Sequence, residues 1–295
     1  MDFLNQLFNG LQLGSIYALV ALGYTMVYGI AKLINFAHGD IIMVGGYTIY
    51  FAIQMFFAQS GLPLWLTIIP AVVVCSLLGV LIERVAYKPL RNSPRITNLI
   101  TAIGISLLLE NLFVKFFSSS AKPVPSIFPN MTFDIFGLSL PLATVITIVV
   151  TVILTILLHL FTRTTKHGKA MLAVSEDYGA ASLVGINVDN TMTMTFAIGS
   201  ALAGVASVLY VASYPQIQPF MGSMLGIKAF TAAVVGGIGN IPGAVFGGFI
   251  LGIIEALTRA YLSSSYADAI VFFVLILVLL IKPTGLLGTN EKEKV

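Results

Sequence analysis

Charged residues are scarce in this sequence. Asp, Glu, Lys and Arg make up 9% of the 295 residues, and 58% of the residues are hydrophobic, whereas a soluble domain carries about 25% charged residues. Charges are missing altogether from residues 3–31, 41–82, 135–158, 190–227 and 229–254. Each run reaches the roughly 20 residues that a helix needs to cross a bilayer. The scarcity therefore excludes a soluble domain and predicts an integral membrane protein.

Cysteine and metal-binding patterns are also nearly absent. Cys75 is the one cysteine, so it cannot form an intrachain disulfide and is interpreted as a small apolar residue of a span. His38, His159 and His167 are too far apart in the sequence to suggest a metal site. No pairing of a nucleophile with a base stands out either. We therefore predict that the chain is not an enzyme and that it holds no metal or cofactor.

The long apolar runs show no alternation of polar and apolar residues, which favours helices over a β-barrel. The predicted fold is an all-α bundle of about 8 to 10 transmembrane spans, and residues 1–295 are predicted to form a single transmembrane domain. The spans are expected near residues 8–31, 41–58, 63–83, 97–117, 138–161, 190–212, 223–239, 242–261 and 267–282.

Basic residues indicate how the bundle is oriented. They are concentrated in two predicted loops: Arg84, Lys88, Arg91 and Arg95 in one, and Arg163, Lys166 and Lys169 in the other. Because short cytoplasmic loops accumulate Lys and Arg, both loops are expected inside the cell. The C-terminal tail, which contains Glu291, Lys292, Glu293 and Lys294, is expected on the same side of the membrane. An odd number of crossings then places the N-terminus outside, in agreement with the absence of basic residues from positions 1–13.

Residues 163–189 form a segment that is too polar to cross the membrane but rich in helix formers. A stripe of mostly small residues recurs in it at spacings of three and four: Ala170, Ala173, Val174, Asp177, Ala180, Ala181 and Val184. This spacing predicts one face of a short cytoplasmic helix that ends at Gly185. An amphipathic connector lying on the membrane is one interpretation. A surface-bound helix, however, usually presents bulky apolar residues, and a face of Ala and Val with Glu176 beside it suits close docking on another protein.

Three motifs resemble those of a known family. The sequence "AASLVG" (180–185) is similar to the core of the coupling segment of ABC importer permeases, although Gly179 stands where a glutamate is usual. This departure is typical of the branched-chain amino acid permeases. The stretches "INFAHGDIIMVGGY" (34–47) and "VVGGIGNIPGAVFGG" (234–248) resemble their early and late signatures. The likeness covers about residues 11–287 and is closest to the smaller of the two permease types.

The resemblance implies several partners. Two permease subunits, the second a related chain, would form the pathway, and an extracellular binding protein would deliver leucine, isoleucine or valine. Two ATPase subunits would bind ATP and Mg, since no G-x-x-x-x-G-K-[ST] motif occurs in this chain. The ATPases would dock on the coupling segment at Ala173, Glu176, Asp177, Ala180, Ala181 and Gly185. The implied location is a bacterial cytoplasmic membrane, and no nucleic acid is expected as a partner.

Glycine-rich interruptions occur in both halves of the chain, at residues 35–46 and 236–248. Paired interruptions of this kind point to a transport site. They predict a translocation pathway or gate formed by Asn35, His38, Gly39, Gly45, Gly46, Gly236, Gly237 and Gly239. The alternative is tight helix packing plus an ordinary loop in which His38 and Asp40 are solvated.

Two carboxylates, Glu110 and Glu255, fall within predicted spans. Such groups should be protonated, paired or hydrated. A proton-coupled secondary amino acid carrier would use them as a relay, which is one alternative function. Structural roles are favoured, because Glu110 lies close to the outer end of its span and Glu255 is four residues before Arg259, at the spacing of a helical ion pair. A permease or passive channel for urea or short amides is a further alternative.

Overall fold

The computed structural model describes residues 2–91, 93–135 and 138–288. The helices are α1 (Asp2–Ala31), α2 (His38–Ala52), α3 (Ala58–Ser60), α4 (Ile68–Ile82), α5 (Arg95–Phe117), α6 (Leu142–Thr164), α7 (Lys166–Glu176), α8 (Tyr178–Leu183), α9 (Val188–Ser213), α10 (Met221–Gly236), α11 (Ile241–Tyr261) and α12 (Ala267–Ile281). π-helical turns at Ile53–Phe57 and Glu83–Tyr87 extend α2 and α4, and 3-10 turns at Leu64–Thr67 and Ser264–Tyr266 precede α4 and α12. The predicted tail residues Glu291, Lys292, Glu293 and Lys294 lie outside the described residues.

Eight of the described helical segments are long and apolar enough to cross a membrane: 3–31, 38–60, 64–87, 96–117, 142–164, 188–213, 241–261 and 264–281. α10 is apolar but has 16 residues, which is short for a full crossing. The seventh of the nine predicted spans, residues 223–239, is therefore too short for a full crossing. The polytopic all-α fold class is confirmed, and the chain is an integral membrane protein.

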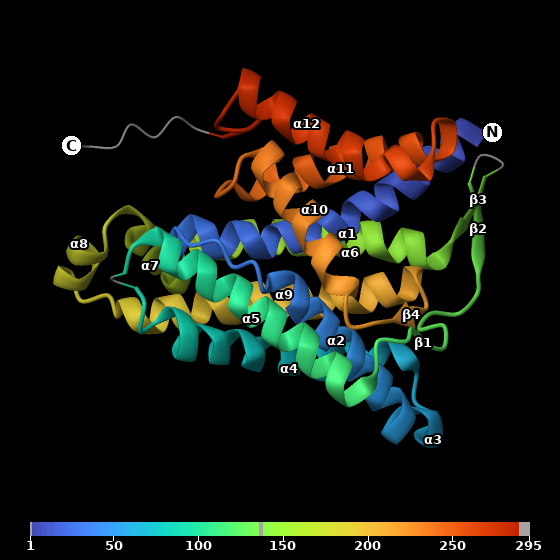
Figure 1. Ribbon diagram of the computed structural model, residues 1–295, viewed down its shortest axis with the longest axis horizontal. Coiled ribbons are helices and arrows are strands. Elements are labelled where there is room, and N and C mark those ends of the chain that lie inside the picture. The colour runs from blue at the N-terminus through green and yellow to red at the C-terminus, as the bar shows by residue number, and fades with distance from the viewer. Residues whose placement is uncertain (1, 92, 136–137, 289–295) are drawn as a thin grey trace.

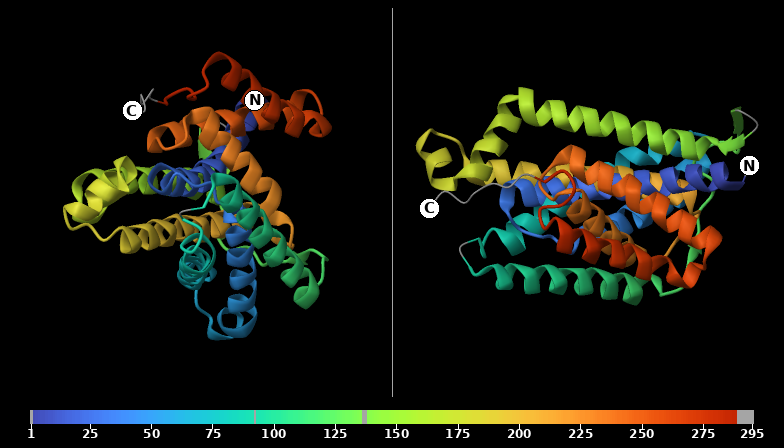
Figure 2. Two further views of the ribbon diagram at one scale, coloured as in Figure 1. Left: turned by 60° about the vertical axis from the view of Figure 1, so that its left-hand side comes forward. Right: turned by 90° about the horizontal axis from the view of Figure 1, so that it is seen from above.

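Most of the long helices run roughly along the long axis of the molecule, whereas α10 is steeply inclined to it, and the start of α1 and the end of α12 lie at opposite ends (Figure 1). α1 lies inside the bundle, where α6, α9, α10 and α11 pack around it (Figure 2). Within the most apolar stretch of each helix, 89% of residues are buried in α1 but only 11% in α5. α1 is thus the core of the bundle, and α5 is at its periphery.

α2 begins inside the bundle rather than at its end. After α1 the chain folds back through residues 32–37 (Figure 1). The imidazole of His38 then lies against Gly23, eight residues before the end of α1, which corresponds to about 12 Å along a helix. The start of α10 meets the start of α2 there, because a Cβ on Gly39 would lie 3.0 Å from Cα of Gly226 and closer still to the carbonyl oxygen of Gly222. Glycine is required for this close approach.

Two short antiparallel pairs of strands lie at the end of the bundle opposite α8 (Figure 1). β2 (Thr132–Ile135) and β3 (Leu138–Pro141) form a hairpin between α5 and α6. β1 (Lys122–Pro123) pairs with β4 (Gln216–Ile217), with Lys122 opposite Ile217. The second pair joins the chain that leaves α5 to the chain that enters α10.

Candidate functional site

The predicted coupling segment forms two helices instead of one. α7 ends at Glu176, Asp177 adopts an extended conformation (φ −157°, ψ 119°), and α8 begins at Tyr178. The Asp177 carboxylate accepts a hydrogen bond of 2.9 Å from the backbone N–H of Ala180. The prediction of a single helix was wrong because Asp177 caps a new helix. The predicted end of the segment is confirmed: Val184 follows the last turn of α8, and Gly185 has a φ of +87°.

This break divides the predicted stripe of small residues between two surroundings. Of the stripe, Val174 and Ala181 are buried within the chain, whereas Ala180 and Val184 are exposed. The stripe therefore does not form one continuous face. Among the predicted coupling residues, those that a partner could contact are Glu176, Asp177, Ala180 and Gly185, with Ala173 partly buried. Ala181 is turned toward the body of the protein, and sequence reasoning missed Leu183, the most exposed apolar residue of α8.

α8 projects beyond the ends of the neighbouring helices at one end of the bundle (Figure 1). Its first residue, Tyr178, is connected to the core. The phenol donates a 2.9 Å hydrogen bond to the carbonyl oxygen of Ala31, the last residue of α1. Burial raises the pKa of the Tyr178 phenol above its ordinary value, and the charge of Arg91 acts in the opposite direction. The phenol is therefore protonated at neutral pH and able to donate this bond.

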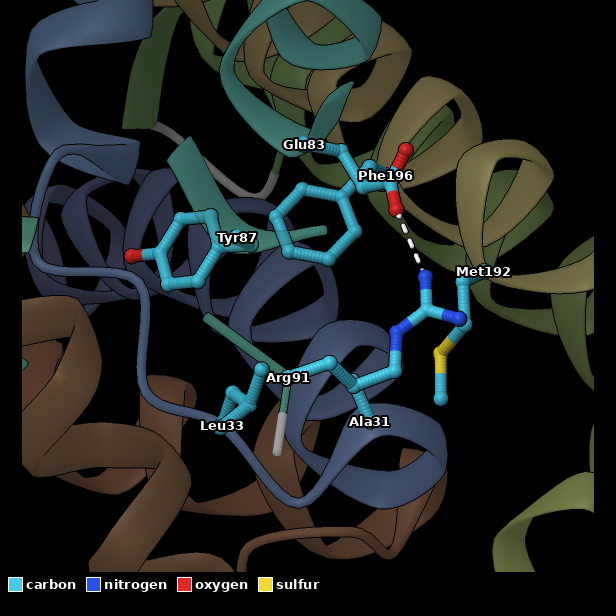
Figure 3. Close-up of a pocket in the computed structure, with 7 residues that line it drawn as sticks. All are labelled: Ala31, Leu33, Glu83, Tyr87, Arg91, Met192 and Phe196. Carbon is cyan, nitrogen blue, oxygen red and sulfur yellow. Dashed lines mark hydrogen bonds and ion pairs between the residues drawn. The ribbon is translucent and has the colours of Figure 1, made fainter. Parts of the chain in front are cut away.

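A polar network lies beside this contact, around a small cavity of about 10 Å³ (Figure 3). The Arg91 guanidinium contacts the buried Glu83 carboxylate at 3.0 Å and the carboxylate of Asp189 in α9 at 2.5 Å. Thr193 of α9 donates a 2.8 Å hydrogen bond to Glu83. The cavity has room for about one water molecule and is too small for an amino acid. The network therefore holds the end of α4 to the start of α9 rather than binding substrate.

The opening motif is attached to the same network. Tyr87 lines the small cavity (Figure 3) and donates a 3.1 Å hydrogen bond to the Asn35 side-chain oxygen. Asn35 lies in the loop that follows Ala31, the residue that Tyr178 contacts. A continuous series of contacts thus leads from α8 through the end of α1 to the loop before α2.

The opening motif is buried. Asn35, His38 and Asp40 are each at most 2% exposed, so the interpretation of His38 and Asp40 as solvated loop residues was wrong. Several side-chain atoms in this part of the bundle have no hydrogen-bond partner among the described residues: Oγ1 of Thr25, Nδ2 of Asn35, Nε2 of His38, Oδ1 of Asp40 and the hydroxyl of Tyr47. Burying polar groups without partners has a free-energy cost, so their presence marks this region for function.

The glycines of the opening motif lie at close helix contacts. A Cβ on Gly45 would lie 2.8 Å from Cβ of Ser207, and one on Gly46 would lie 3.1 Å from Cε of Met221. Tight packing, the alternative to a pathway, thus describes Gly39, Gly45 and Gly46 in this conformation. Their role in a pathway or gate stays a prediction.

The later glycine-rich segment lies elsewhere. Gly236 packs on Gly243, Gly237 (φ +111°) lies against Gly288, and Gly239 (φ +92°) lies near the end of α1 beside Gly29. The partner of the opening motif is instead the start of α10, at Gly222 and Gly226. Gly236 ends α10, and Gly237 and Gly239 lie in the turn between α10 and α11.

Glu255 of α11 is at the centre of a buried ionic cluster. Its carboxylate accepts hydrogen bonds of 2.7 Å from the Tyr17 hydroxyl and from the Lys228 ammonium, and it also pairs with Arg259. Lys228 reaches Asp268 of α12 as well, at 2.6 Å. The predicted pairing of Glu255 with Arg259 is confirmed. Sequence reasoning missed Lys228, although it is the single charge between two long uncharged runs.

Glu110 of α5 is 6% exposed and accepts a hydrogen bond from Ser223 of α10. The interpretation of Glu110 as a hydrated residue near the outer end was therefore wrong. α10 begins inside the bundle and covers this carboxylate, although the rest of α5 is mostly exposed.

These features define a class of protein: a polytopic helical membrane protein with buried polar groups at a helix interruption and a projecting two-helix segment tied to its core helix. Within that class, the family described as branched-chain amino acid transport system / permease component matches residues 6–279. The chain belongs to this family.

Known proteins support the assignment over the full length. The high-affinity branched-chain amino acid transport system permease protein LivH of Escherichia coli K12 is 47% identical over 304 residues, covering 99% of this chain and 98% of LivH. The corresponding protein BraD of Pseudomonas aeruginosa is 45% identical, with the same coverage. The ribose import permease protein RbsC of E. coli K12 is 26% identical over 98% of this chain and 87% of RbsC.

Among solved structures, PsaBC from Streptococcus pneumoniae in complex with Fab shares the fold. The TM-score is 0.51 at 16% sequence identity, and the match covers 96% of this chain and 93% of that chain. At this level of identity the likeness supports the arrangement of the helices and nothing finer.

Proposed function

We propose that this chain is the permease subunit of an ATP-driven importer that moves leucine, isoleucine and valine across a bacterial cytoplasmic membrane. Its family membership and its similarity to LivH and BraD, which are branched-chain amino acid transport permeases, support this proposal. A second, related permease completes the pathway, two separate ATPase subunits bind ATP and Mg, and an extracellular protein delivers the amino acid. The N-terminus lies outside the cell, and α7, α8 and the C-terminus lie inside.

In this proposal α8 transmits the movement of an ATPase subunit to the pathway. The exposed residues Ala180, Leu183 and Val184 form the docking surface. Displacement of α8 pulls on Ala31 through Tyr178, and the loop after Ala31 carries the movement to Asn35 and the start of α2. The observation that carries the proposal is the hydrogen bond from the Tyr178 hydroxyl to the Ala31 carbonyl, because it joins an exposed helix to the core helix of the bundle.

Uptake of labelled leucine by proteoliposomes that hold the complete complex and its binding protein tests this function. We expect uptake to need ATP and to continue in the presence of a protonophore. Uptake that collapses with the protonophore while ATP remains would indicate a proton-coupled carrier. Labelled urea in a parallel assay distinguishes an amide permease, and uptake without ATP identifies a passive channel.

The variant Ala180→Arg tests the docking surface. A charged, bulky side chain on an exposed small position should block close docking without disturbing the fold, so leucine uptake should fall at least about tenfold, the equivalent of about 1.4 kcal/mol, while the permease pair still assembles. Leu172→Arg is the matched control, because Leu172 is an exposed residue of the neighbouring helix α7. Equal loss in both variants, or normal uptake with Ala180→Arg, would contradict the proposed docking surface.

A further inference from the structure

The buried acids of the bundle differ in how their charge is balanced. Glu255 has Lys228 and Arg259 beside it, and Glu83 has Arg91. No Lys, Arg or His among the described residues forms a salt bridge with Asp40 or Glu110. Asp40 is 1% exposed, and its Oδ1 has no hydrogen-bond partner in the part of the chain that the structure describes. A carboxylate buried in a membrane has to be protonated or paired, and a positively charged ligand would supply the cation that the described residues do not place beside Asp40.

Asp40 and Glu110 lie on facing elements. These elements, α2 and α5, contact each other, and Ser106, one turn before Glu110 in α5, is a hydrogen-bonding neighbour of the Asp40 carboxylate. The start of α10 connects the two acids: a Cβ on Gly222 would lie 3.1 Å from Cα of Asp40, and the next residue, Ser223, donates a hydrogen bond to Glu110. Two acidic side chains and two hydroxyls therefore converge where α2, α5 and α10 meet.

An apolar cavity of about 480 Å³ begins one helical turn away. It is lined by Val44, Val74, Leu77, Leu78, Leu81, Leu109 and Phe113. Val44 follows Asp40 by one turn of α2, and Leu109 precedes Glu110 in α5. This cavity is an open groove at the surface of the bundle rather than an enclosed pocket, because Leu77 and Leu81 are exposed. The cavity is built only from aliphatic and aromatic side chains, so it suits an aliphatic group rather than a sugar or an amide.

We propose that Asp40 and Glu110 bind the α-ammonium group of an amino acid whose branched aliphatic side chain enters the cavity between α4 and α5. This inference rests on the proposed function and names the substrate contacts that it requires. The ammonium group supplies the positive charge that the chain itself does not place beside these acids. The exposed residues Leu77 and Leu81 form the open side of the cavity, which the second permease subunit would cover.

Two simple compounds separate the parts of this site. Isoamylamine carries the ammonium group and a branched side chain, and 4-methylpentanoate carries the side chain with a carboxylate but no ammonium group. In a thermal-melting assay of the purified complex without its binding protein, isoamylamine should raise the melting temperature and 4-methylpentanoate at the same concentration should not. The variant Asp40→Asn should abolish the shift, and Glu110→Gln should reduce it. Asp268→Asn, which changes a half-exposed acid of the Glu255 cluster, is the matched control and should keep the shift.

Leucine uptake gives the second measurement. Asp40→Asn should lower uptake about 10- to 100-fold, the effect of losing a hydrogen bond to a charged group, and Asp40→Glu should restore part of it. The empty Asp40→Asn complex should be at least as stable as wild type, because the variant removes a buried acid that forms no salt bridge among the described residues. A role of Asp40 in folding predicts the opposite, so a less stable or unassembled Asp40→Asn complex counts against the proposal.

Three further results would overturn the proposal: an isoamylamine shift that persists in Asp40→Asn, wild-type leucine uptake by Asp40→Asn, or an equal Asp40-dependent shift with sodium or potassium chloride, which would identify an inorganic cation site. The proposed function fails in a different way. In that case the wild-type complex takes up no leucine with ATP, whatever the amine does to its melting temperature.

Discussion

Glu255 and Asp40 are both acids buried in the same helical bundle, and they are surrounded very differently. Glu255, with no exposed surface, has three donors on α1, α10 and α11. Asp40 has an oxygen with no partner among the described residues, and its charged neighbour is another acid. The chain therefore satisfies one carboxylate internally and leaves the other for a ligand. The contacts of Glu255 hold α1, α10 and α11 together, whereas Asp40 is suited to binding a cationic ligand.

Glu255→Leu should have the largest effect on stability. It would remove the shared acceptor of Lys228 and the Tyr17 hydroxyl and leave Lys228 with the half-exposed Asp268 alone, at a cost of up to about 3–5 kcal/mol. The expected result is a strongly lowered melting temperature of the purified complex, or failure to assemble.

The double variant Lys228→Met with Glu255→Leu is the control for this prediction. Replacing both charges with apolar groups should restore most of the stability, although Arg259 and Asp268 lose partners in it. If the double variant is as unstable as Glu255→Leu alone, packing rather than charge accounts for the effect.

Glu83→Gln should have an intermediate effect. The amide can still accept the hydrogen bond from Thr193, but the charge that faces Arg91 is lost, so destabilisation of about 1.5–3 kcal/mol is expected. Lys88→Met gives the comparison, because the pair between Lys88 and Asp189 is half exposed and should contribute below about 1 kcal/mol. Glu83→Gln should therefore lower the melting temperature more than Lys88→Met does. Equal melting temperatures would show that burial does not strengthen the pair of Glu83 with Arg91.

Tyr17→Phe should have the smallest effect of the three. It removes one of three donors to Glu255 and leaves both cations in place, so the loss should be about 0.5–1.5 kcal/mol. The melting temperature of the complex measures it. A loss as large as that of Glu255→Leu would mean that the phenol, not the two cations, holds the carboxylate.

The helical fold could be predicted because its cause is local. A chain with so few charges must satisfy its backbone hydrogen bonds inside the membrane, and helices do this within each segment. The pair of Glu255 with Arg259 was also local, since four residues make one helical turn. Lys228 could not be assigned in this way, because 27 residues separate it from Glu255 and only the packing of α10 on α11 brings them together.

The candidate sites were only partly predictable for the same reason. The sequence indicated that residues 163–189 contain a helix, but whether Asp177 continues that helix or caps the next one depends on how α7 and α8 pack on the bundle. The opening motif was recognised from its glycines. The start of α2 is buried against Gly222, which is 183 positions after Gly39, and no local pattern links the two.

The pairing of β1 with β4 has a mechanical consequence. β1 follows α5, which carries Glu110, and β4 precedes α10, which carries Ser223. The two strands pair at the end of the bundle opposite α8. The pairing therefore connects α5 to α10 at that end. A displacement of α5 would therefore be transmitted to α10, and the reverse. A protein that binds at this end of the bundle would move Glu110 and Ser223 together, toward or away from Asp40.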